Sequence, residues 1–264
     1  MPPFLLTDKI AVITGGANGI GRACALAFAR QGADVVLADI ADEPLRDAAA
    51  AVQALGRRAL AVRCDVSKDT DVDELARRTI EAFGRADLVM LNAGVAVGGR
   101  WEHIPVEEWR RLLDINVLGV ARGLHALLPH LIERGSGHVV ITTSSLGLDV
   151  RDGGAGPYVT SKFALTGMAR ALALYLHPMG IGVTLLAPRL TDTAFPRNSV
   201  AWGAHGPRVR ADREITGADT PGDVAEVLLA ALREGRFLAA ADPDLGERIT
   251  AFARDPDAAV RPQA

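Results

Sequence analysis

Two residues one helical turn apart, Tyr158 and Lys162, are the pair in this sequence best suited to moving a proton. Residues i and i+4 of a helix share a face, and Pro157 stands where it favours a first helical turn. A neighbouring ammonium stabilises phenolate, so we expect Lys162 to lower the pKa of Tyr158 from its ordinary value of about 10. Only three of the 29 basic residues are Lys, and a compact ammonium suits proton transfer better than Arg. The spacing predicts a general acid/base pair.

A glycine-rich turn, TGGANGIG at 14–21, joins an apolar run to a helical pattern. Glycines at 15, 19 and 21 would let the backbone approach a pyrophosphate, and the N–H groups at the start of the helix would bind it. An ordinary strand-to-helix turn is the alternative. The motif by itself therefore favours cofactor binding without requiring it.

Asp39 ends the second apolar run, 18 residues after Gly21. A carboxylate at this place can accept hydrogen bonds from the hydroxyls of an adenosine ribose, and it would repel a 2′-phosphate. Position 18 is Asn, and no Arg directly follows Asp39. The sequence predicts NAD(H) rather than NADP(H), with a solvated strand-end Asp as the alternative.

Continuous apolar runs alternate with helical patterns along the chain. Such runs suit strands buried on both faces of a parallel sheet, and the alternation predicts right-handed βαβ units in one doubly wound α/β domain. We expect seven mostly parallel strands, at 9–14, 34–39, 59–63, 87–91, 138–143, 181–187 and 236–240, and helices at 19–31, 43–55, 69–83, 107–133, 157–177 and 221–233.

The expected domain covers residues 1–264, with a cofactor half at about 1–135, a catalytic and substrate half at about 136–254, and a tail at 255–264 with little fixed structure. Two connections, 146–156 and 188–220, are long. Loops of this length in a compact domain are functional or disordered.

Composition limits the function classes. The net charge is −3 and the basic residues are spread along the chain, which gives no electrostatic case for nucleic acid or an anionic membrane. No segment reaches the ~18–20 apolar residues of a membrane span, and the N-terminus does not look like a signal peptide. Cys24 and Cys64 match no metal or disulfide spacing. We expect a soluble cytoplasmic protein without a metal site.

The motifs together resemble those of the short-chain dehydrogenase/reductase family over nearly the whole chain. Family order and intervals are matched by TGGANGIG, Asp39, CDV at 64–66, LNAG at 91–94, Asn116, the serines of ITTSSLG at 141–147, and YVTSK at 158–162. The resemblance implies that Tyr158 protonates a ketone or deprotonates an alcohol. It also implies that Lys162 lowers the Tyr158 pKa and bonds the nicotinamide ribose, that Ser144 holds the substrate oxygen, and that Asn116 ties Lys162 to a water chain.

The same resemblance implies an NAD site, with Asp65 and Val66 at the adenine. The implied cofactor residues are Gly15, Asn18, Gly19, Ile20, Gly21, Asp39, Ile40, Asp65, Val66, Asn92, Ala93, Gly94, Tyr158, Lys162, Pro188, Thr191 and Thr193.

Two positions stay open at this point. Strand register counted from Gly137 makes Ser144 the catalytic serine, whereas counting back from Tyr158 reaches Ser145; we favour Ser144 because strand register is less elastic than loop length. Arg189 follows Pro188 where the family usually has Gly. Either the backbone differs there, or a cation lies near the nicotinamide or the substrate.

The connection 188–220 is expected to cover the substrate. It could bind an anionic or aromatic substrate, or be a solvated loop with one or two aromatics packed inward; its candidates are Phe195, Arg197, Trp202, His205, Arg208, Arg210 and Arg213.

The expected function is interconversion of a secondary alcohol and a ketone with NAD(H). The alternatives are the same chemistry on a sugar or steroid-like ring, and a non-catalytic NAD(H)-binding regulator. Helices 107–133 and 157–177 are expected to form a homodimer, and a second interface a tetramer, as the resemblance implies.

Overall fold

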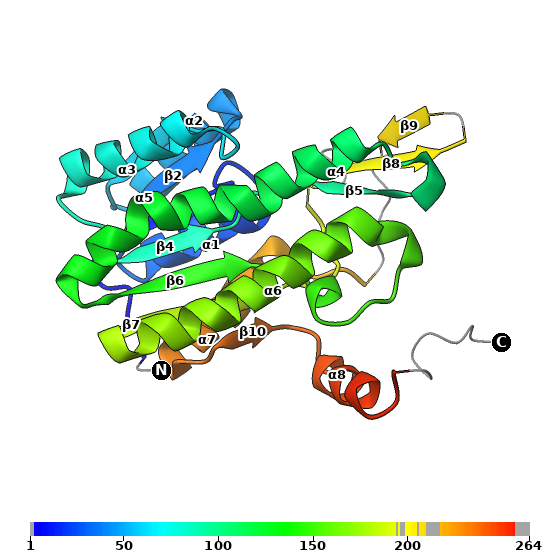
Figure 1. Cartoon of the computed structure of the whole chain (residues 1–264). Coiled ribbons are helices and arrows are strands. Elements are labelled where there is room, and N and C mark those ends of the chain that lie inside the picture. The colour runs from blue at the N-terminus through cyan, green and yellow to red at the C-terminus, as the bar shows by residue number, and fades with distance from the viewer. Residues whose placement is uncertain (1–2, 194, 196–198, 205, 210–216, 257–264) are drawn as a thin grey trace.

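Seven parallel strands form the central sheet of the computed structural model, which describes residues 3–193, 195, 199–204, 206–209 and 217–256. The strand order is β10-β7-β6-β4-β1-β2-β3 (Figure 1). The strands are β1 Ile10–Thr14, β2 Asp34–Asp39, β3 Ala59–Arg63, β4 Leu88–Leu91, β6 Gly137–Thr142, β7 Ile181–Ala187 and β10 Leu238–Ala240. The predicted doubly wound α/β fold with seven strands is confirmed.

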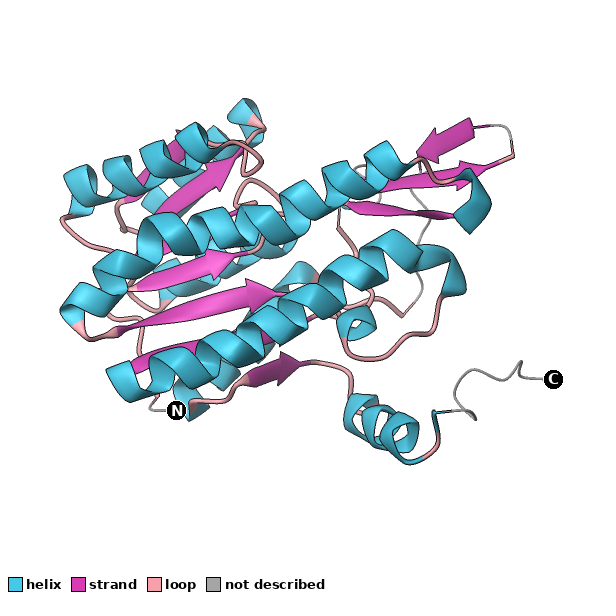
Figure 2. Ribbon diagram, viewed as in Figure 1, coloured by secondary structure: helices cyan, strands magenta, loops and turns pink. Residues whose placement is uncertain are grey.

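Helices cover both faces of this sheet (Figure 2). One core cluster joins the sheet to α1 (Gly19–Arg30), α2 (Asp42–Gln53) and α7 (Pro221–Glu234). The other joins it to α3 (Asp69–Phe83), α5 (Gly119–Arg134) and α6 (Gly156–Leu176). The strand order reverses at β1, whose neighbours are β2 and β4. Ligands of such sheets bind at this point, beside the carboxyl ends of the strands.

The helix predicted at 107–133 is continuous but changes its winding. α4 (Val106–Leu113) leads into a π-helical segment, Asp114–Leu118, and then into α5. On length and composition, Val106–Arg134 is the one helix of the described chain that could cross a membrane. Core helices of soluble proteins meet the same criterion, and buried residues of α5 pack on the sheet.

A second, three-stranded sheet lies beyond the carboxyl ends of the main strands (Figure 1). Its order is β5 (Ala96–Gly99), β8 (Ser199–Gly203), β9 (Gly206–Val209), with β5 and β8 parallel and β8 and β9 antiparallel. The prediction of a loop throughout 188–220 is therefore wrong at 199–203 and 206–209. Close approach at Gly99 makes the pairing possible, because a Cβ there would lie 2.1 Å from the carbonyl oxygen of Trp202.

Two other expectations need correction. β3 is an edge strand, so residues 59–61 are only half-buried and not enclosed on both faces. A helix not predicted from the sequence, α8 (Leu245–Arg254), follows β10 and buries one residue, Leu245. Residues 257–264 of the expected tail lie outside the described residues. Short 3₁₀ turns occur at Trp101–His103, Ser145–Gly147, Gly153–Ala155 and His177–Met179.

Candidate active site

Tyr158 and Lys162 lie one turn apart in the first part of α6, as predicted. The segment before them is fixed by Trp101, whose indole N–H donates to the Gly153 carbonyl at 2.7 Å. The Trp101 ring also fills the space that a side chain at 156 would need, since a Cβ there would come within 2.4 Å of it. These contacts fix the start of the helix that carries the pair.

Lys162 is buried and its ammonium reaches the end of β6. Nζ donates to the Thr142 carbonyl at 3.1 Å and lies 5.5 Å from the centre of the Tyr158 ring. The Tyr158 ring also meets the ring of Phe195, with 5.9 Å between centroids. The ammonium is therefore close to the phenol while bonded to the sheet.

The pKa of Tyr158 departs from the expected direction. Burial raises the pKa of Tyr158 to about 12, and a hydrogen bond with the Ser144 side chain acts in the opposite sense. Burial also lowers the pKa of Lys162 to about 8. Removal from water thus dominates the pKa of both groups in the protein alone, and the lowering of the Tyr158 pKa by Lys162 stays a prediction.

Of the two candidate serines, Ser144 is the one whose side chain lies close enough to Tyr158 to act on its pKa. Its Oγ also accepts the N–H of Leu146 at 3.2 Å, which fixes the turn that begins there. Ser145 instead uses its backbone N–H to bond the Pro188 carbonyl at 2.9 Å. The two strand-end serines therefore have different surroundings, and only Ser144 has a contact with Tyr158 among those described.

Asn116 lies fully buried in the π-helical segment. Its Oδ1 accepts the Val95 N–H at 2.8 Å, and its Nδ2 donates to the Val95 carbonyl at 2.9 Å and to Ser161 Oγ at 3.0 Å. These bonds tie the segment after β4 to α6. Asn116 is therefore connected to Lys162 through Ser161, the residue that precedes Lys162 in the chain.

The glycine turn after β1 is a cradle that side chains would fill. Gly15 has φ +66°, and a Cβ at Gly21 would lie 2.1 Å from the Gly15 carbonyl oxygen. Within the described part of the chain no side chain caps the first turn of α1, so its N–H groups can meet a pyrophosphate. Asn92 holds this turn in place by donating to the carbonyls of Thr14 (3.1 Å) and Gly15 (3.3 Å).

Asp39 lies at the end of β2 beside that turn. Its carboxylate accepts the N–H groups of Ala17 and Ala41, both at 3.1 Å, and Ile40 next to it is exposed. Sequence reasoning missed Arg63, which pairs in register with Asp39 from the neighbouring strand and forms a 3.7 Å ion pair with Asp42. Only strand pairing brings this cation to the site.

The next two residues expected at the adenine lie at the end of β3. The Asp65 carboxylate is engaged by Ser67, through N–H at 3.0 Å and Oγ at 2.7 Å. Val66 is buried, and a Cβ on Gly119 would lie 2.9 Å from it. Ala93 and Gly94 follow β4 and are half-buried, between the glycine turn and Asn116.

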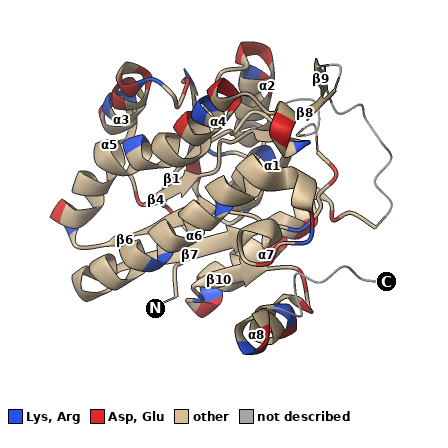
Figure 3. Cartoon of the chain, turned by 45° about the vertical axis from the view of Figure 1, so that its right-hand side comes forward, with Lys and Arg blue, Asp and Glu red and all other residues tan. Residues whose placement is uncertain are grey.

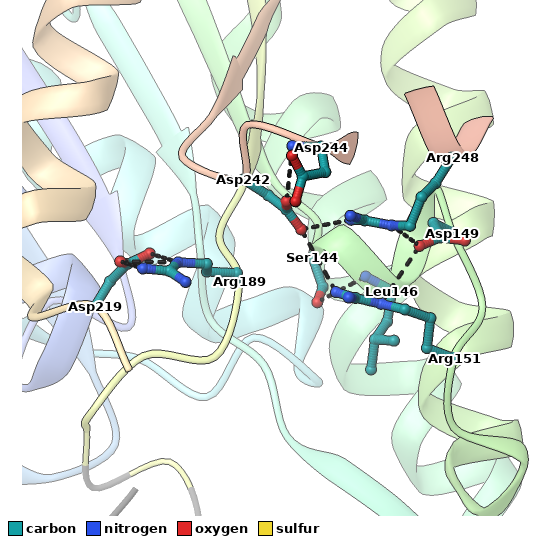
Figure 4. Close-up of polar contacts among 9 residues, drawn as sticks. All are labelled: Ser144, Leu146, Asp149, Arg151, Arg189, Asp219, Asp242, Asp244 and Arg248. Atoms are coloured by element: carbon teal, nitrogen blue, oxygen red, sulfur yellow. Dashed lines mark hydrogen bonds and ion pairs between the residues drawn. The ribbon is translucent and has the colours of Figure 1, made fainter. Parts of the chain in front are cut away.

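Arg189 does not reach Ser144; it turns onto Asp219, a residue that the sequence did not single out (Figure 4). Its Nε and Nη2 atoms bond the Asp219 carboxylate at 2.6–2.9 Å. Thr191 pairs with Asp219 through the backbone. Thr193 approaches the glycine turn, where a Cβ on Gly19 would come within 3.2 Å of it. The Arg189–Asp219 pair thus joins the two ends of the connection 188–220, which is expected to cover the substrate.

The upper part of that connection is described only in places. Phe195 lies against Tyr158, and Trp202 belongs to the cluster of side chains around Val97 and Leu112 that also includes Tyr158. Arg197, His205, Arg210, Arg213 and the side chain of Arg208 lie outside the described residues.

A doubly wound parallel sheet with a glycine cradle after its first strand defines a Rossmann-type nucleotide-binding protein. The family model of the short chain dehydrogenases matches residues 9–203, and the chain belongs to this family. It is 36% identical over 202 residues to an uncharacterised NAD-dependent oxidoreductase of Mycobacterium tuberculosis, covering 71% of this chain and 73% of the relative.

Two further proteins are similar over most of the chain. The BbsD subunit of (2S)-[(R)-hydroxy(phenyl)methyl]succinyl-CoA dehydrogenase from Thauera aromatica is 36% identical over 190 residues, covering 71% of this chain and 75% of that one. The crystal structure of a short-chain dehydrogenase/reductase from Burkholderia phymatum in complex with NAD superposes with a TM-score of 0.87 at 29% identity, covering 99% and 98% of the two chains. The chain is an oxidoreductase of this family.

Proposed function

We propose that the protein interconverts a secondary alcohol and a ketone with NAD(H), with Tyr158 as the general acid/base. The observation that carries the proposal is the grouping of Tyr158, Lys162 and Ser144 at the carboxyl end of β6. The glycine cradle after β1, at the reversal of strand order, supplies a place for the dinucleotide. The NAD-dependent relative and the NAD complex of the similar structure support the choice of cofactor.

When bound, the nicotinamide would take up or supply the hydride, and the protein's own residues manage the proton. In the oxidising direction the alcohol O–H proton passes to Oη of the Tyr158 phenolate, and the ketone forms as the C–H hydrogen leaves with its electron pair. Ser144 Oγ, which lies beside Tyr158, would hold the substrate oxygen by a hydrogen bond. Lys162, with a pKa of about 8, carries its charge near neutrality and favours the phenolate.

Asp39 is proposed to select NAD(H). Its carboxylate ends β2 beside the glycine turn, which supports a role in accepting hydrogen bonds from the adenosine ribose hydroxyls, and its charge would repel a 2′-phosphate. The other contacts implied by the resemblance, from Asn18 and Ile20 to Pro188, Thr191 and Thr193, belong to the same proposal. Asn116 is proposed to position α6 through Ser161.

The experiment measures NADH formation from a panel of secondary alcohols, including sugar and steroid-like ring alcohols, and compares NAD with NADP. Tyr158→Phe should lower kcat by about 10²–10⁴-fold, because the proton acceptor is removed. Tyr175→Phe is the matched control, since the other Tyr also lies on α6 and is exposed. An unchanged rate in Tyr158→Phe would overturn the mechanism, and tighter binding of NADP than NAD would overturn the role of Asp39.

We further propose a homo-oligomer that pairs through α5 and α6. α5 and α6 carry few charged residues (Figure 3), and several large apolar residues on or beside them are exposed. The residues are Leu118 before α5, Ile132 on α5, and Phe163, Leu174 and Tyr175 on α6. The choice between dimer and tetramer and the cytoplasmic location stay predictions.

A further inference from the structure

Four charged side chains form a closed cluster that joins the C-terminal helix to the turn after Ser144 (Figure 4). Each guanidinium spans both carboxylates. Arg248 donates through Nε to Asp149 at 2.6 Å and through Nη2 to Asp242 at 2.5 Å. Arg151 approaches the same two carboxylates, each at 3.4 Å. The cluster connects two segments that are far apart in the sequence, the turn at 149–151 and the stretch 242–248.

The carboxylates of this cluster are shielded from water. The Asp242 and Asp149 side chains are 8% and 15% exposed, and that of Arg248 is 25% exposed. The hydrogen bond from Arg248 holds the pKa of Asp242 below its usual range. Shielded carboxylates need a partner of this kind. Because α8 buries only Leu245, these ion pairs are a principal attachment of the helix.

The cluster acts on the turn that begins at the proposed catalytic serine. The N–H groups of Leu148 and Asp149 donate to the Ser145 carbonyl at 3.1 and 2.9 Å. The Ser145 N–H donates to the Pro188 carbonyl at 2.9 Å. The turn is thus held by Pro188 at its start and by Arg248, through Asp149, at its end.

We propose that Asp149, Asp242 and Arg248 are positioning residues through which α8 holds the Ser144 turn in the geometry that the substrate requires. The effect on turnover rests on the proposed function. The cluster is attached to the turn after β6 and not to the glycine turn or Asp39, so substrate binding and turnover depend on it while NAD binding does not.

The test compares Arg248→Gln, Arg248→Lys and Arg254→Gln. Arg254 is an exposed Arg on the same helix and controls for loss of one positive charge. In Arg248→Gln, amide hydrogen exchange in 145–149 should accelerate and substrate KM should rise, both by about tenfold, as expected for coupling within one network. The affinity for NAD should stay within about twofold of the unchanged protein.

For Arg248→Lys, the exchange rate in 145–149 and the substrate KM should lie between those of the unchanged protein and those of Arg248→Gln. The reason is that one ammonium cannot bridge both carboxylates as the guanidinium fork does. Asp149→Asn combined with Arg248→Gln should exchange no faster than the single Arg248→Gln variant, since both break the same link.

The proposal would be overturned if amide exchange in 145–149 were unchanged in Arg248→Gln. It would also be overturned if the affinity for NAD fell by the same factor as the substrate KM rose. Hydrogen exchange needs no turnover, so this outcome is distinct from failure of the proposed function. If the proposed function were wrong, the protein without any substitution would form no NADH from any alcohol of the panel.

Discussion

Lys162 is a buried amine, and its burial has a measurable consequence for stability. Burial lowers its pKa to about 8 in the folded protein, below the ordinary value of about 10.4. Between these values the unfolded chain binds more protons than the folded one, so stability rises as pH increases through this window. Below pH ~8 the full destabilising effect of the buried charge is present.

Lys162→Met should therefore stabilise the protein near pH 7 by about 2 kcal/mol while abolishing the proposed proton-handling pair. The gain should shrink as pH approaches about 10, where the unchanged protein recovers stability. Urea unfolding at several pH values measures both effects. Lys68→Met, at an exposed position, should change stability by less than about 0.5 kcal/mol. A Lys162→Met variant less stable at every pH would contradict this account.

At the residue scale, the sequence predicted that Tyr158 and Lys162 lie together but did not predict their protonation states. The i, i+4 spacing was enough to place Tyr158 and Lys162 on one face. The direction of the Tyr158 pKa depends on how much water the finished fold leaves around the ring, which no local pattern contains. The orientation of Arg189 was equally hidden, because its partner Asp219 lies 30 residues later in the chain.

At the element scale, β6 and β7 are joined by a buried pair of polar side chains. His138 Nε2 and Thr184 Oγ1 are 2.9 Å apart, and Thr184 donates to the Arg236 carbonyl. Because the Thr184 hydroxyl donates its proton to that carbonyl, its oxygen must accept a hydrogen bond from an N–H group at Nε2 of His138. Burial lowers the pKa of His138 to about 3.

The folded protein consequently becomes less stable as pH falls below the ordinary His value of about 6.5, because only the unfolded chain takes up the proton. From pH 7 to about pH 5 this one residue should cost about 2 kcal/mol of stability. His138→Gln, which does not titrate, should lack that part of the loss in urea unfolding. His177→Gln, at an exposed helix end, should retain it. If the free energy of unfolding fell equally with pH in His138→Gln and in the unchanged protein, His138 would not be the source of the acid destabilisation.

The elements that could be predicted are those with a strong local signal. Continuous apolar runs predicted all seven strands of the main sheet, although the edge strand β3 is only half-buried at 59–61. β5 and β8 were missed because their pairing joins residues about a hundred positions apart and depends on space at Gly99. α8 was missed because ion pairs from Arg248, rather than a buried apolar face, hold it. The π-helical segment was missed because it follows from the tertiary bonds of Asn116.

For the whole molecule, the distribution of apolar surface bears on assembly. The long helix Val106–Arg134 is apolar, yet only 33% of its most apolar stretch is buried within one chain. On α6, Leu174 is 81% exposed and Tyr175 57%. Large apolar side chains exposed on neighbouring turns of a helix are typical of an interaction site, and a surface that meets its own copy gives a twofold dimer.

We therefore expect Leu174→Asp to weaken or abolish self-association, because a C2 interface places the new carboxylate in both copies of the buried patch. The loss should be large, since an unpaired charge at an interface core costs several kcal/mol. Sedimentation velocity over a range of protein concentrations would follow the change in mass, and NAD affinity would show that the fold is kept. Leu55→Asp is the matched control, because Leu55 is also exposed (40%) but follows α2, which packs in the core cluster on the other side of the sheet from α5 and α6. If Leu174→Asp and the unchanged protein had the same mass at every concentration, the chain would not assemble through this face of α6.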